Sequence, residues 1–417
     1  MLKGNTISLA LSIILLLQSC SSFVPMERAL HESSDSAFTA YLKNEEIPVT
    51  HNNEVKVLNG AHAKFESLFE DIRNARHHIH LEYFNFRNDS INKVVISLLE
   101  EKAKEGVEVR AMFDAFGNMS NDRPLKEKHL EEIRAKGIKI VEFDPITFPW
   151  VNHATSRDHR KIVVIDGRIG YTGGINVADY YLEGLEGVGE WRDMHSRVEG
   201  AAVAELQKIF LDMWYEETGE LIVSKEYYPE HNNTSNSSVA VIDRWPGRTP
   251  KTMRRAYANA INSAKDSLII VNPYFMPTPI IMKSIKKAIS DGVKVSILIS
   301  EKSDIPMVPD VVWHTANKLM KRGAEIYVYT GGFNHSKVMS VDGKFYTLGS
   351  TNLNSRSLRY DYETNIFVFG KDDTDELNRY IDLDKKNGYI LTKEKYKERS
   401  WWRRFCGWVS SLLIPFL

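Results

Sequence analysis

The sequence contains one series of structural elements twice, and this internal repeat restricts its fold more than any other feature. Glycines that end predicted helices mark the two copies. Gly106 and Gly292 are separated by 186 residues, and so are Gly137 and Gly323. Because the same offset occurs at two independent places, the chain is predicted to consist of two copies of one unit.

Predicted strands and helices alternate in both copies. The strands are expected at 79–84, 107–110 and 138–141 in the first copy, and at 270–275, 293–296 and 324–327 in the second. The segments that follow the first and second strands carry apolar residues at helical spacing. Alternation of this kind predicts two tandem α/β domains with largely parallel strands. A chain of 417 residues is long enough for two such cores.

Composition suggests where the domains begin and end. A polar run at 228–238, rich in Asn and Ser, is typical of an exposed linker. We therefore predict domains at 54–227 and 239–395. The weakly patterned segment 20–53 is interpreted as a tether, and residues 396–417 as a C-terminal tail.

The N-terminus has the pattern of an export signal. The apolar stretch from Ile7 to Leu17 is eleven residues long, which is too short to span a bilayer. It is followed by Cys20, and the whole resembles a bacterial lipoprotein signal, with residues 1–19 removed and lipid attached at Cys20. That resemblance implies a lipid-anchored protein of the bacterial cell envelope, at the outer membrane or periplasmic face. A plain cleaved signal or an uncleaved anchor is the alternative.

Charge and cysteine content exclude several classes of protein. The 54 Lys and Arg residues are matched by 55 Asp and Glu residues, so the net charge is −1. No global positive field exists to attract nucleic acid, and no nucleic-acid partner is expected. With only Cys20 and Cys406, the fold does not depend on a disulfide framework.

Each copy ends in the same set of chemically active residues. The pattern is H-x-K, four residues, D, six residues, then G-[GS]-x-N. One H-x-K means little, but two copies with identical internal spacing indicate a functional site. The side chains concerned are His159, Lys161, Asp166 and Asn176 in the first copy, and His335, Lys337, Asp342 and Asn352 in the second.

These residue types suit chemistry on a phosphoryl group. Residues two apart in a strand face the same way, so the histidine and lysine of each motif are expected to share one cleft. Lysine and asparagine side chains hold charged oxygens. One neutral imidazole can attack phosphorus while a protonated one supplies the leaving group with a proton. This scheme needs no metal and no other cofactor. A zinc site is the rival, but lysine is no ligand partner and no Cys or carboxylate cluster accompanies the histidines.

The motifs resemble those of the phospholipase D superfamily, and more narrowly the bacterial cardiolipin synthases, from about Val55 to the C-terminus. The stretches that carry this resemblance are 158–167, 173–176, 191–193, 272–277, 335–337, 352–357 and 413–417. The typical synthases of this group carry two N-terminal transmembrane helices, which this chain lacks.

The resemblance implies a fold and a set of roles. The two domains would pack around a pseudo-twofold axis, with one active site at their interface. His159 would be the nucleophile and His335 the general acid and base, although which histidine attacks is less certain than that both are needed. Asp193 and Glu363 match carboxylates that orient the histidines. Asp166 and Asp342, though grouped with the catalytic residues, are expected to be mainly structural.

Four functions are compatible with these features. The resemblance favours a transferase that moves a phosphatidyl group between two phosphatidylglycerol molecules, giving cardiolipin and glycerol. A hydrolase would pass the same intermediate to water and release phosphatidic acid. An exported nuclease of the superfamily is disfavoured by the charge balance, and a non-enzymatic lipoprotein by the two intact motifs.

Two further groups suggest contact with lipid. The tail combines Trp401, Trp402 and Trp408 with arginines and aliphatic residues, as an interfacial membrane segment does. The alternative is a helix that packs on the body with these aromatic residues in its core. The aromatic residues Phe148, Trp150, Tyr274 and Phe275, with Pro149, would line a lipid entrance or belong to the core.

Overall fold

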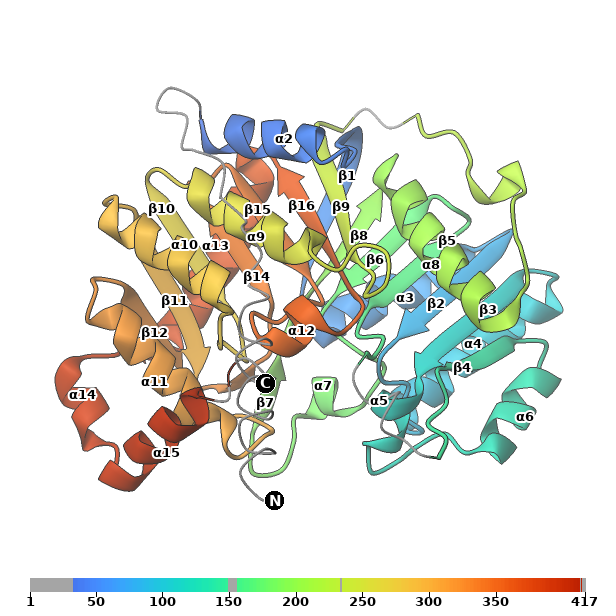
Figure 1. Ribbon diagram of the computed structural model, residues 1–417. Helices are drawn as coiled ribbons and strands as arrows, with labels where there is room; N and C mark the ends of the chain where they lie inside the picture. Colours follow the sequence, from blue (N-terminus) through green and yellow to red (C-terminus); the bar gives the residue numbers. More distant parts are fainter. Residues whose placement is uncertain (1–32, 149–155, 233–234, 413, 415–417) are drawn as a thin grey trace, which may run out of the picture.

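The computed structural model describes residues 33–148, 156–232, 235–412 and 414. It shows two α/β halves side by side (Figure 1). The elements of the first half are α2 (Ser34–Asn44), β1 (Thr50–Asn59), α3 (Ala61–Asn74), β2 (His78–Tyr83), α4 (Ser90–Lys104), β3 (Glu108–Asp114), α5 (Ala115–Met119), α6 (Glu127–Ala135), β4 (Lys139–Phe143), β5 (Lys161–Ile165), β6 (Ile169–Gly173), α7 (Tyr180–Glu183), β7 (Glu190–Arg192), β8 (Met194–Glu199), α8 (Ala202–Thr218) and the 3₁₀ helix η1 (Lys225–Tyr227).

The second half repeats this order. Its elements are β9 (Ser237–Arg244), α9 (Thr252–Ser263), β10 (Ser267–Val271), α10 (Pro279–Ser290), β11 (Lys294–Ser300), α11 (Val308–Met320), β12 (Glu325–Tyr329), β13 (Gly332–Asn334), β14 (Val338–Val341), β15 (Phe345–Gly349), α12 (Ser355–Arg359), β16 (Glu363–Phe369), α13 (Lys371–Lys386), β17 (Gly388–Ile390), α14 (Lys393–Glu398) and α15 (Trp401–Ser411).

One continuous sheet runs through both halves. Its strand order is β17-β12-β11-β10-β14-β15-β16-β9-β1-β8-β6-β5-β2-β3-β4. Starting from the antiparallel β1–β9 pair at the centre, the order on either side is the same when equivalent strands are compared, except that β17 at the edge of the second half has no counterpart in the first. β2, β3 and β4 pair in parallel, as do β10, β11 and β12, and the remaining pairs in this sheet are antiparallel. The expected tandem α/β halves with pseudo-twofold symmetry are therefore confirmed.

The repeated glycines lie where the repeat requires them. Gly106 and Gly292 have φ angles of 92° and 87°, just past the ends of α4 and α10. Only glycine adopts this left-handed backbone without steric cost, so it ends both helices before the next strand.

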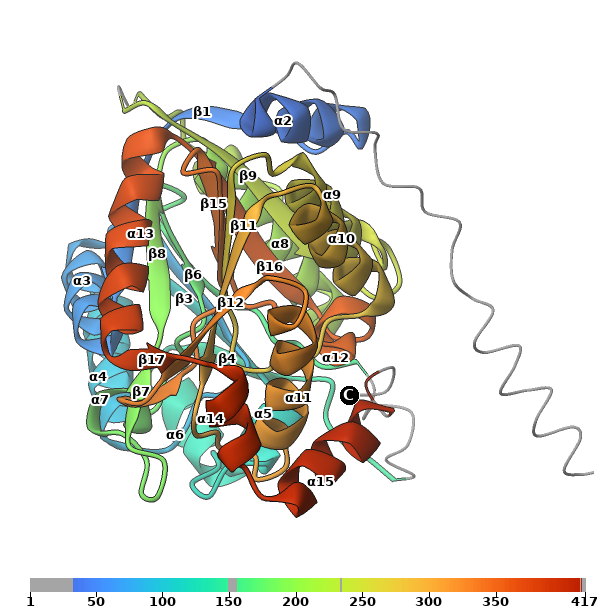
Figure 2. The same cartoon turned by 90° about the vertical axis from the view of Figure 1, so that its left-hand side faces the viewer.

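The two halves share a hydrophobic core. Val57 of β1, Val164 of β5 and Leu206 of α8 belong to the same buried cluster as Ile366 of β16 and Leu377 of α13. Figure 2 shows the arrangement from the side, with α3, α4 and α13 on one face of the sheet and α8, α9 and α10 on the other. Each face is thus covered by helices from both halves, and burial of this apolar surface holds the halves together.

The tether prediction is wrong for residues 33–53. α2 buries Phe38 and Leu42 completely against the core of the second half, and β1 begins at Thr50 in the middle of the sheet. The helix escaped detection because its apolar face is short, with Ala37, Phe38, Tyr41 and Leu42 in an otherwise polar segment.

The strand expected at 270–275 is shorter than predicted. β10 ends at Val271, and Asn272 to Phe275 form an irregular turn. Pro273 has no N–H to donate to a strand ladder, which explains why the strand stops before it.

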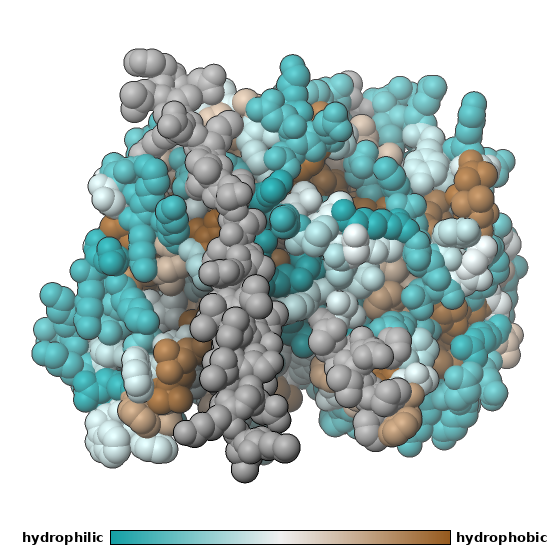
Figure 3. Space-filling model, in the orientation of Figure 1, coloured by the Kyte–Doolittle hydropathy of each residue, from teal (hydrophilic) through white to brown (hydrophobic). Residues whose placement is uncertain are grey.

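Several sequence predictions lie outside the described residues. They concern the signal sequence 1–19, Cys20, residues 20–32 of the tether, Pro149 and Trp150, and most of 413–417. Among the residues that the structure does describe, no helix has both the length and the apolar character needed to cross a bilayer. Hydrophilic side chains cover much of the face seen in Figure 3.

The packing of α2 leads to a stability prediction. The Phe38 ring stacks on Phe345 with 5.2 Å between centroids, and it has no exposed surface. Phe38→Ala should lower the free energy of unfolding by about 3–5 kcal/mol, because it leaves a cavity in the core. Urea unfolding measures this change. Lys43→Ala, on the exposed side of the same helix, is the control and should change it by less than about 0.5 kcal/mol. Equal, small effects of both substitutions would mean that α2 is detached from the body.

Candidate active site

Each motif histidine is held by a carboxylate from the other half of the chain. His335 Nδ1 lies 2.7 Å from Asp193 Oδ2. His159 Nδ1 lies 3.1 Å from Glu363 Oε1. An N–H on Nδ1 donated to a carboxylate leaves Nε2 of each ring to face a substrate. The two motifs, 176 residues apart in sequence, thus form one site at the interface of the halves.

Short parallel pairings between the halves place these residues. β13 pairs with β7 so that Asn334 faces Arg192, and the next residues are His335 and Asp193. The N–H of His335 donates to the carbonyl of Arg192 at 2.6 Å.

The other side repeats this geometry. Asp158 forms an isolated parallel bridge with Tyr362, and the next residues are His159 and Glu363. The N–H of His159 donates to the Tyr362 carbonyl at 3.0 Å. Backbone hydrogen bonds therefore position both histidines independently of their side-chain contacts.

The lysine of each motif contacts the histidine of the same motif, whereas the asparagines of the two motifs have different hydrogen-bond partners. Lys161 Nζ donates to the carbonyl of His159 at 2.5 Å, and Lys337 Nζ donates to that of His335. The Oδ1 atom of Asn176 accepts the N–H of Asn85, and its Nδ2 atom donates to the Tyr181 hydroxyl. The Oδ1 atom of Asn352 is buried without a hydrogen-bond partner. Of the two, Asn352 is therefore the better placed to respond to a bound ligand.

Asp166 and Asp342 lie away from this cleft. Asp166 follows the C-terminal end of β5, whereas His159 precedes its N-terminal end. The length of this five-residue strand, about 17 Å at roughly 3.3 Å per residue, therefore lies between them. Asp166 accepts the N–H groups of Arg76, His77 and His78, and so anchors the start of β2.

Asp342 does the same in the second half. It accepts the N–H groups of Lys265, Asp266 and Ser267 at the start of β10. Their grouping with the catalytic residues does not fit this geometry, and the structural role does.

Burial and the two lysines set the charges of the site. Burial, with help from Lys161, lowers the pKa of His159 to about 4, and burial and Lys337 lower that of His335 well below its usual value. Lys161 contributes to the lowering at His335, which places charge from the first half within reach of the second histidine. Burial also lowers the pKa of Lys161 to about 8 and that of Lys337 to about 7. Burial thus disfavours positive charge in this site, and a bound anion would favour it.

The two carboxylates respond differently to burial. Burial raises the pKa of Asp193 to about 6, although Lys337 opposes the shift. Burial would also raise the pKa of Glu363, but His159 and Lys161 overcome it and the pKa is lowered. The Ser350 hydroxyl donates to Glu363 as well. At the equivalent position the first half has Gly174, where a Cβ atom would lie only 2.4 Å from the Asp193 oxygens.

The walls beside the two histidines also differ. Four aromatic rings surround His335, with centroid distances of 5.3 Å for Trp191, 5.5 Å for Phe333, 5.9 Å for Tyr274 and 6.2 Å for Tyr181. The wall beside His335 is therefore built mainly of aromatic rings.

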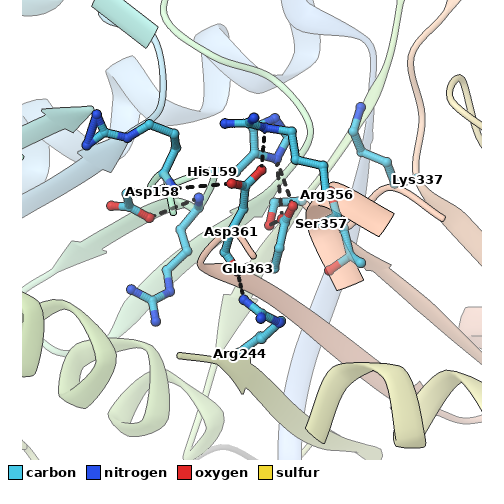
Figure 4. A network of polar contacts seen from close by, with 12 residues as sticks. Asp158, His159, Arg244, Lys337, Arg356, Ser357, Asp361 and Glu363 are labelled. Carbon is cyan, nitrogen blue, oxygen red and sulfur yellow. Dashed lines mark hydrogen bonds and ion pairs between the residues drawn. The ribbon is translucent and has the colours of Figure 1, made fainter. Parts of the chain in front are cut away.

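The wall beside His159 is more polar. The Phe84 ring lies 5.0 Å from His159. Figure 4 shows Arg356, Asp361 and Glu363 grouped with His159. Arg356 is ion-paired to Asp361 at 3.0 Å, and Arg244 donates to the Asp361 carbonyl.

Sequence reasoning missed part of this site. Ser350, Trp191, Tyr181 and Phe333 were not singled out, although the serine in the second G-[GS]-x-N motif was a visible difference between the copies. Of the residues expected at a lipid entrance or in the core, Tyr274 faces His335, Phe275 is in the core of the second half, and Phe148 is exposed. Within the described ranges, no group of three or more His, Cys, Asp or Glu residues is arranged to hold a metal ion.

A family model described as "Cardiolipin synthase, PLD-like domain" matches residues 68–214 and 257–385. The chain belongs to this family. The matched ranges include both histidines, both lysines and both carboxylates of the site.

Curated relatives agree with this assignment. A protein named cardiolipin synthase from Listeria monocytogenes serotype 4a is 34% identical over 379 residues, which cover 90% of this chain and 78% of the relative. Another, from Geobacillus kaustophilus, is 35% identical over 373 residues, covering 89% and 74%.

Solved structures support the fold. A phosphatidylserine synthase from Haemophilus influenzae superposes with a TM-score of 0.68 at 14% identity, over 92% of this chain and all of that one. The identity is too low for more than the shared architecture.

The position of Asp166 gives a prediction that separates a structural from a catalytic role. Asp166→Ala should lower the free energy of unfolding by about 1–3 kcal/mol, because three backbone N–H groups lose their acceptor. The φ angle of 55° at this residue also disfavours alanine. Chemical denaturation measures the effect, and Asp342→Ala should behave alike. Normal stability combined with lost turnover in either variant would contradict the structural role.

Proposed function

We propose that this chain is a cardiolipin synthase that joins two phosphatidylglycerol molecules and releases glycerol. The observation that carries the proposal is the pair of motif histidines, each oriented by a carboxylate of the other half, in a member of the cardiolipin synthase family. Two oppositely placed imidazoles with two lysines provide a nucleophile, an acid and an anion-binding site without a further reagent.

In the first step, His159 Nε2 attacks the phosphorus of one phosphatidylglycerol. A P–N bond forms while the P–O bond to the glycerol headgroup breaks, and the proton of a cationic His335 passes to the departing oxygen. Glu363 supports this role for His159 because it remains anionic and accepts the Nδ1 proton. Lys161 and Lys337 bind the non-bridging oxygens, which carry the charge of the transition state.

In the second step, His335 acts as a base. It takes the proton from a glycerol hydroxyl of the second phosphatidylglycerol, whose oxygen attacks phosphorus as the P–N bond breaks. His159 is regenerated and cardiolipin leaves. Since burial lowers the pKa of His335, its cationic form depends on the negative charge of a bound phosphodiester, so the acid is available when substrate is present.

The aromatic wall favours transfer over hydrolysis. Both the leaving and the incoming alcohol lie on the His335 side in this scheme, where Trp191, Tyr181 and Tyr274 limit access by water. An alcohol presented by a lipid headgroup is held there at high effective concentration. A hydrolase that releases phosphatidic acid would be expected to have a more open and more polar wall at this place.

The proposal also includes the boundaries of the domains and the location of the enzyme in the cell. The catalytic body comprises the domains 54–227 and 239–395, joined by 228–238, together with α2 and the first residues of β1, which precede residue 54. We further propose that residues 1–19 are removed and that Cys20 carries lipid, so that the enzyme faces its phospholipid substrates from a membrane of the cell envelope. Mass spectrometry of the N-terminal peptide from the natural host tests the lipid at Cys20 directly.

The activity itself is tested by product analysis. The purified chain is incubated with phosphatidylglycerol vesicles, without added metal or nucleotide, and products are identified by mass spectrometry. Cardiolipin with an equal amount of glycerol is expected, and His159→Ala and His335→Ala should each abolish both. Phosphatidic acid as the main product would replace the transferase with a phospholipase. Absence of any lipid product from the unaltered chain would reject the proposal.

The lowered pKa values of the lysines predict a pH dependence. A lysine with a lowered pKa loses its positive charge at lower pH than usual, here near 7 for Lys337 and near 8 for Lys161. Because the cationic forms bind the phosphodiester, kcat/KM should fall as pH rises through 7 and 8. Steady-state rates with vesicles across this range measure it. In Lys337→Arg the positive charge at this position persists. The fall of any remaining activity with rising pH should therefore move to higher pH. A profile that is flat to pH 9, about one unit above the Lys161 value, would contradict this assignment.

The aromatic wall predicts a change in product ratio. Tyr274→Ser removes one ring beside His335, so water should compete better and the ratio of phosphatidic acid to cardiolipin should rise about tenfold. Phe84→Ser is the matched control, because it removes a ring beside His159 and should change the rate more than the ratio. The reverse result, with Phe84→Ser shifting the ratio, would indicate that His335 is the nucleophile.

A further inference from the structure

Helix α15 has the reverse of the burial pattern expected for a helix on a protein surface. Its buried residues are Gly407 and Ser410, which are small or polar. Apart from Arg403, its exposed residues are large and apolar, and they are Trp401, Trp402, Phe405, Trp408 and Val409, followed by Leu412 just after the helix. The exposed fractions of Trp401, Trp402 and Trp408 are 69%, 56% and 50%. The alternative that these aromatic residues form a packed core is therefore wrong.

The exposed side chains form one continuous row. The rings of Trp401 and Trp402, of Trp402 and Phe405, and of Phe405 and Trp408 lie 5.7, 5.8 and 5.9 Å apart. Residues three or four apart on a helix share a face, which brings these rings together. Scattered apolar residues on a surface need no explanation, but a contiguous aromatic face marks an interaction site.

The opposite face of α15 fixes the helix firmly to the body. A Cβ atom at Gly407 would lie 2.3 Å from the Asp310 carbonyl oxygen, so only glycine allows this close approach to α11. Arg399, just before α15, is ion-paired to Asp310 and lies over the Trp313 ring. Beyond the helix, the carbonyl of Ile414 accepts the Ser355 hydroxyl at 2.6 Å. Contacts before, within and after α15 thus hold its aromatic face outward.

The charge around α15 indicates what kind of surface its aromatic face binds. Residues 393–404 contain six basic and two acidic residues, a net charge of +4 in a chain whose total is −1. The rest of the chain is therefore at −5. Tryptophan and phenylalanine beside arginine are suited to the headgroup region of a bilayer, and the local positive charge favours anionic lipid. Exposed tryptophans would also suit a protein partner, but the positive charge concentrated beside them favours an anionic lipid surface.

We infer that α15 docks flat on an anionic phospholipid bilayer, with its aromatic row in the interface and Arg403 among the headgroups. The choice of lipid rests on the proposed function. In Figures 1 and 2, α15 lies at the lower end of the molecule, as do α5 and α7. In Figure 3, brown and near-white side chains meet at the lower left, where Figure 1 draws this helix. Ser355, which binds Ile414, lies three residues after Asn352 of the second motif, so the docked helix connects directly to the active-site region.

A fluorescent probe on the helix tests this inference without requiring activity. Trp402→Cys is made in the full chain with Cys20→Ser and Cys406→Ser, and the new thiol is labelled with an environment-sensitive dye. Phosphatidylglycerol vesicles should shift the emission to the blue, and phosphatidylcholine vesicles should do so less. The same dye at Val223→Cys, a residue 76% exposed on the body, is the control and should not shift. No shift at position 402, or equal shifts at both positions, would overturn the proposal.

A second variant separates docking from catalysis. Trp402→Ser, Phe405→Ser and Trp408→Ser are combined. Because these residues are exposed, the variant should fold like the unaltered chain, which circular dichroism verifies. Turnover of phosphatidylglycerol vesicles should fall about tenfold or more, while turnover of monomeric short-chain phosphatidylglycerol should remain. Leu221→Ser with Val223→Ser is the matched control on other exposed apolar residues. A dye shift that appears without vesicles as protein concentration rises would instead assign the face to a second copy of the chain.

Discussion

The structure depends on two hydrogen bonds that cross between its halves, from His335 to Asp193 and from His159 to Glu363. For both motif histidines, the partner carboxylate belongs to the other half. The central β1–β9 pairing and the shared core therefore have to bring the halves together before either imidazole is oriented. Catalytic geometry and the stability of the interface are consequently maintained by the same contacts.

The symmetry of the backbone is accompanied by asymmetry of the side chains. The bridges that place the two histidines are equivalent residue by residue, but Glu363 is paired with Ser350 whereas Asp193 packs against Gly174. The shorter carboxylate fits where glycine leaves room, and the longer one reaches a hydroxyl. Together with the aromatic rings around His335, these differences give two chemically distinct histidines within one repeated framework.

The sequence was sufficient for the repeat, the α/β class and the set of residues at the centre, because these follow from fixed spacings and from periodic apolar residues. It was not sufficient for α2, whose short apolar face becomes meaningful only against Phe345 and its neighbours in the second half. Spacing alone did not separate Asp166 from His159, and only the resemblance implied a structural role for the aspartate; the two residues lie seven apart in the chain but at opposite ends of a strand. For α15 the sequence suggested lipid contact but left a packed aromatic core as the alternative, since a helical pattern does not say which face is buried.

The crossed pairing also constrains how such a chain can change through evolution. After a duplication, the two copies of a gene segment are usually free to diverge, because each copy supports itself. Here a substitution at Asp193 is felt at His335, and one at Glu363 is felt at His159, so each copy carries part of the other's function. The two halves must therefore evolve as a matched set, and a segment exchanged from a distant homologue would have to bring its partner from the opposite half.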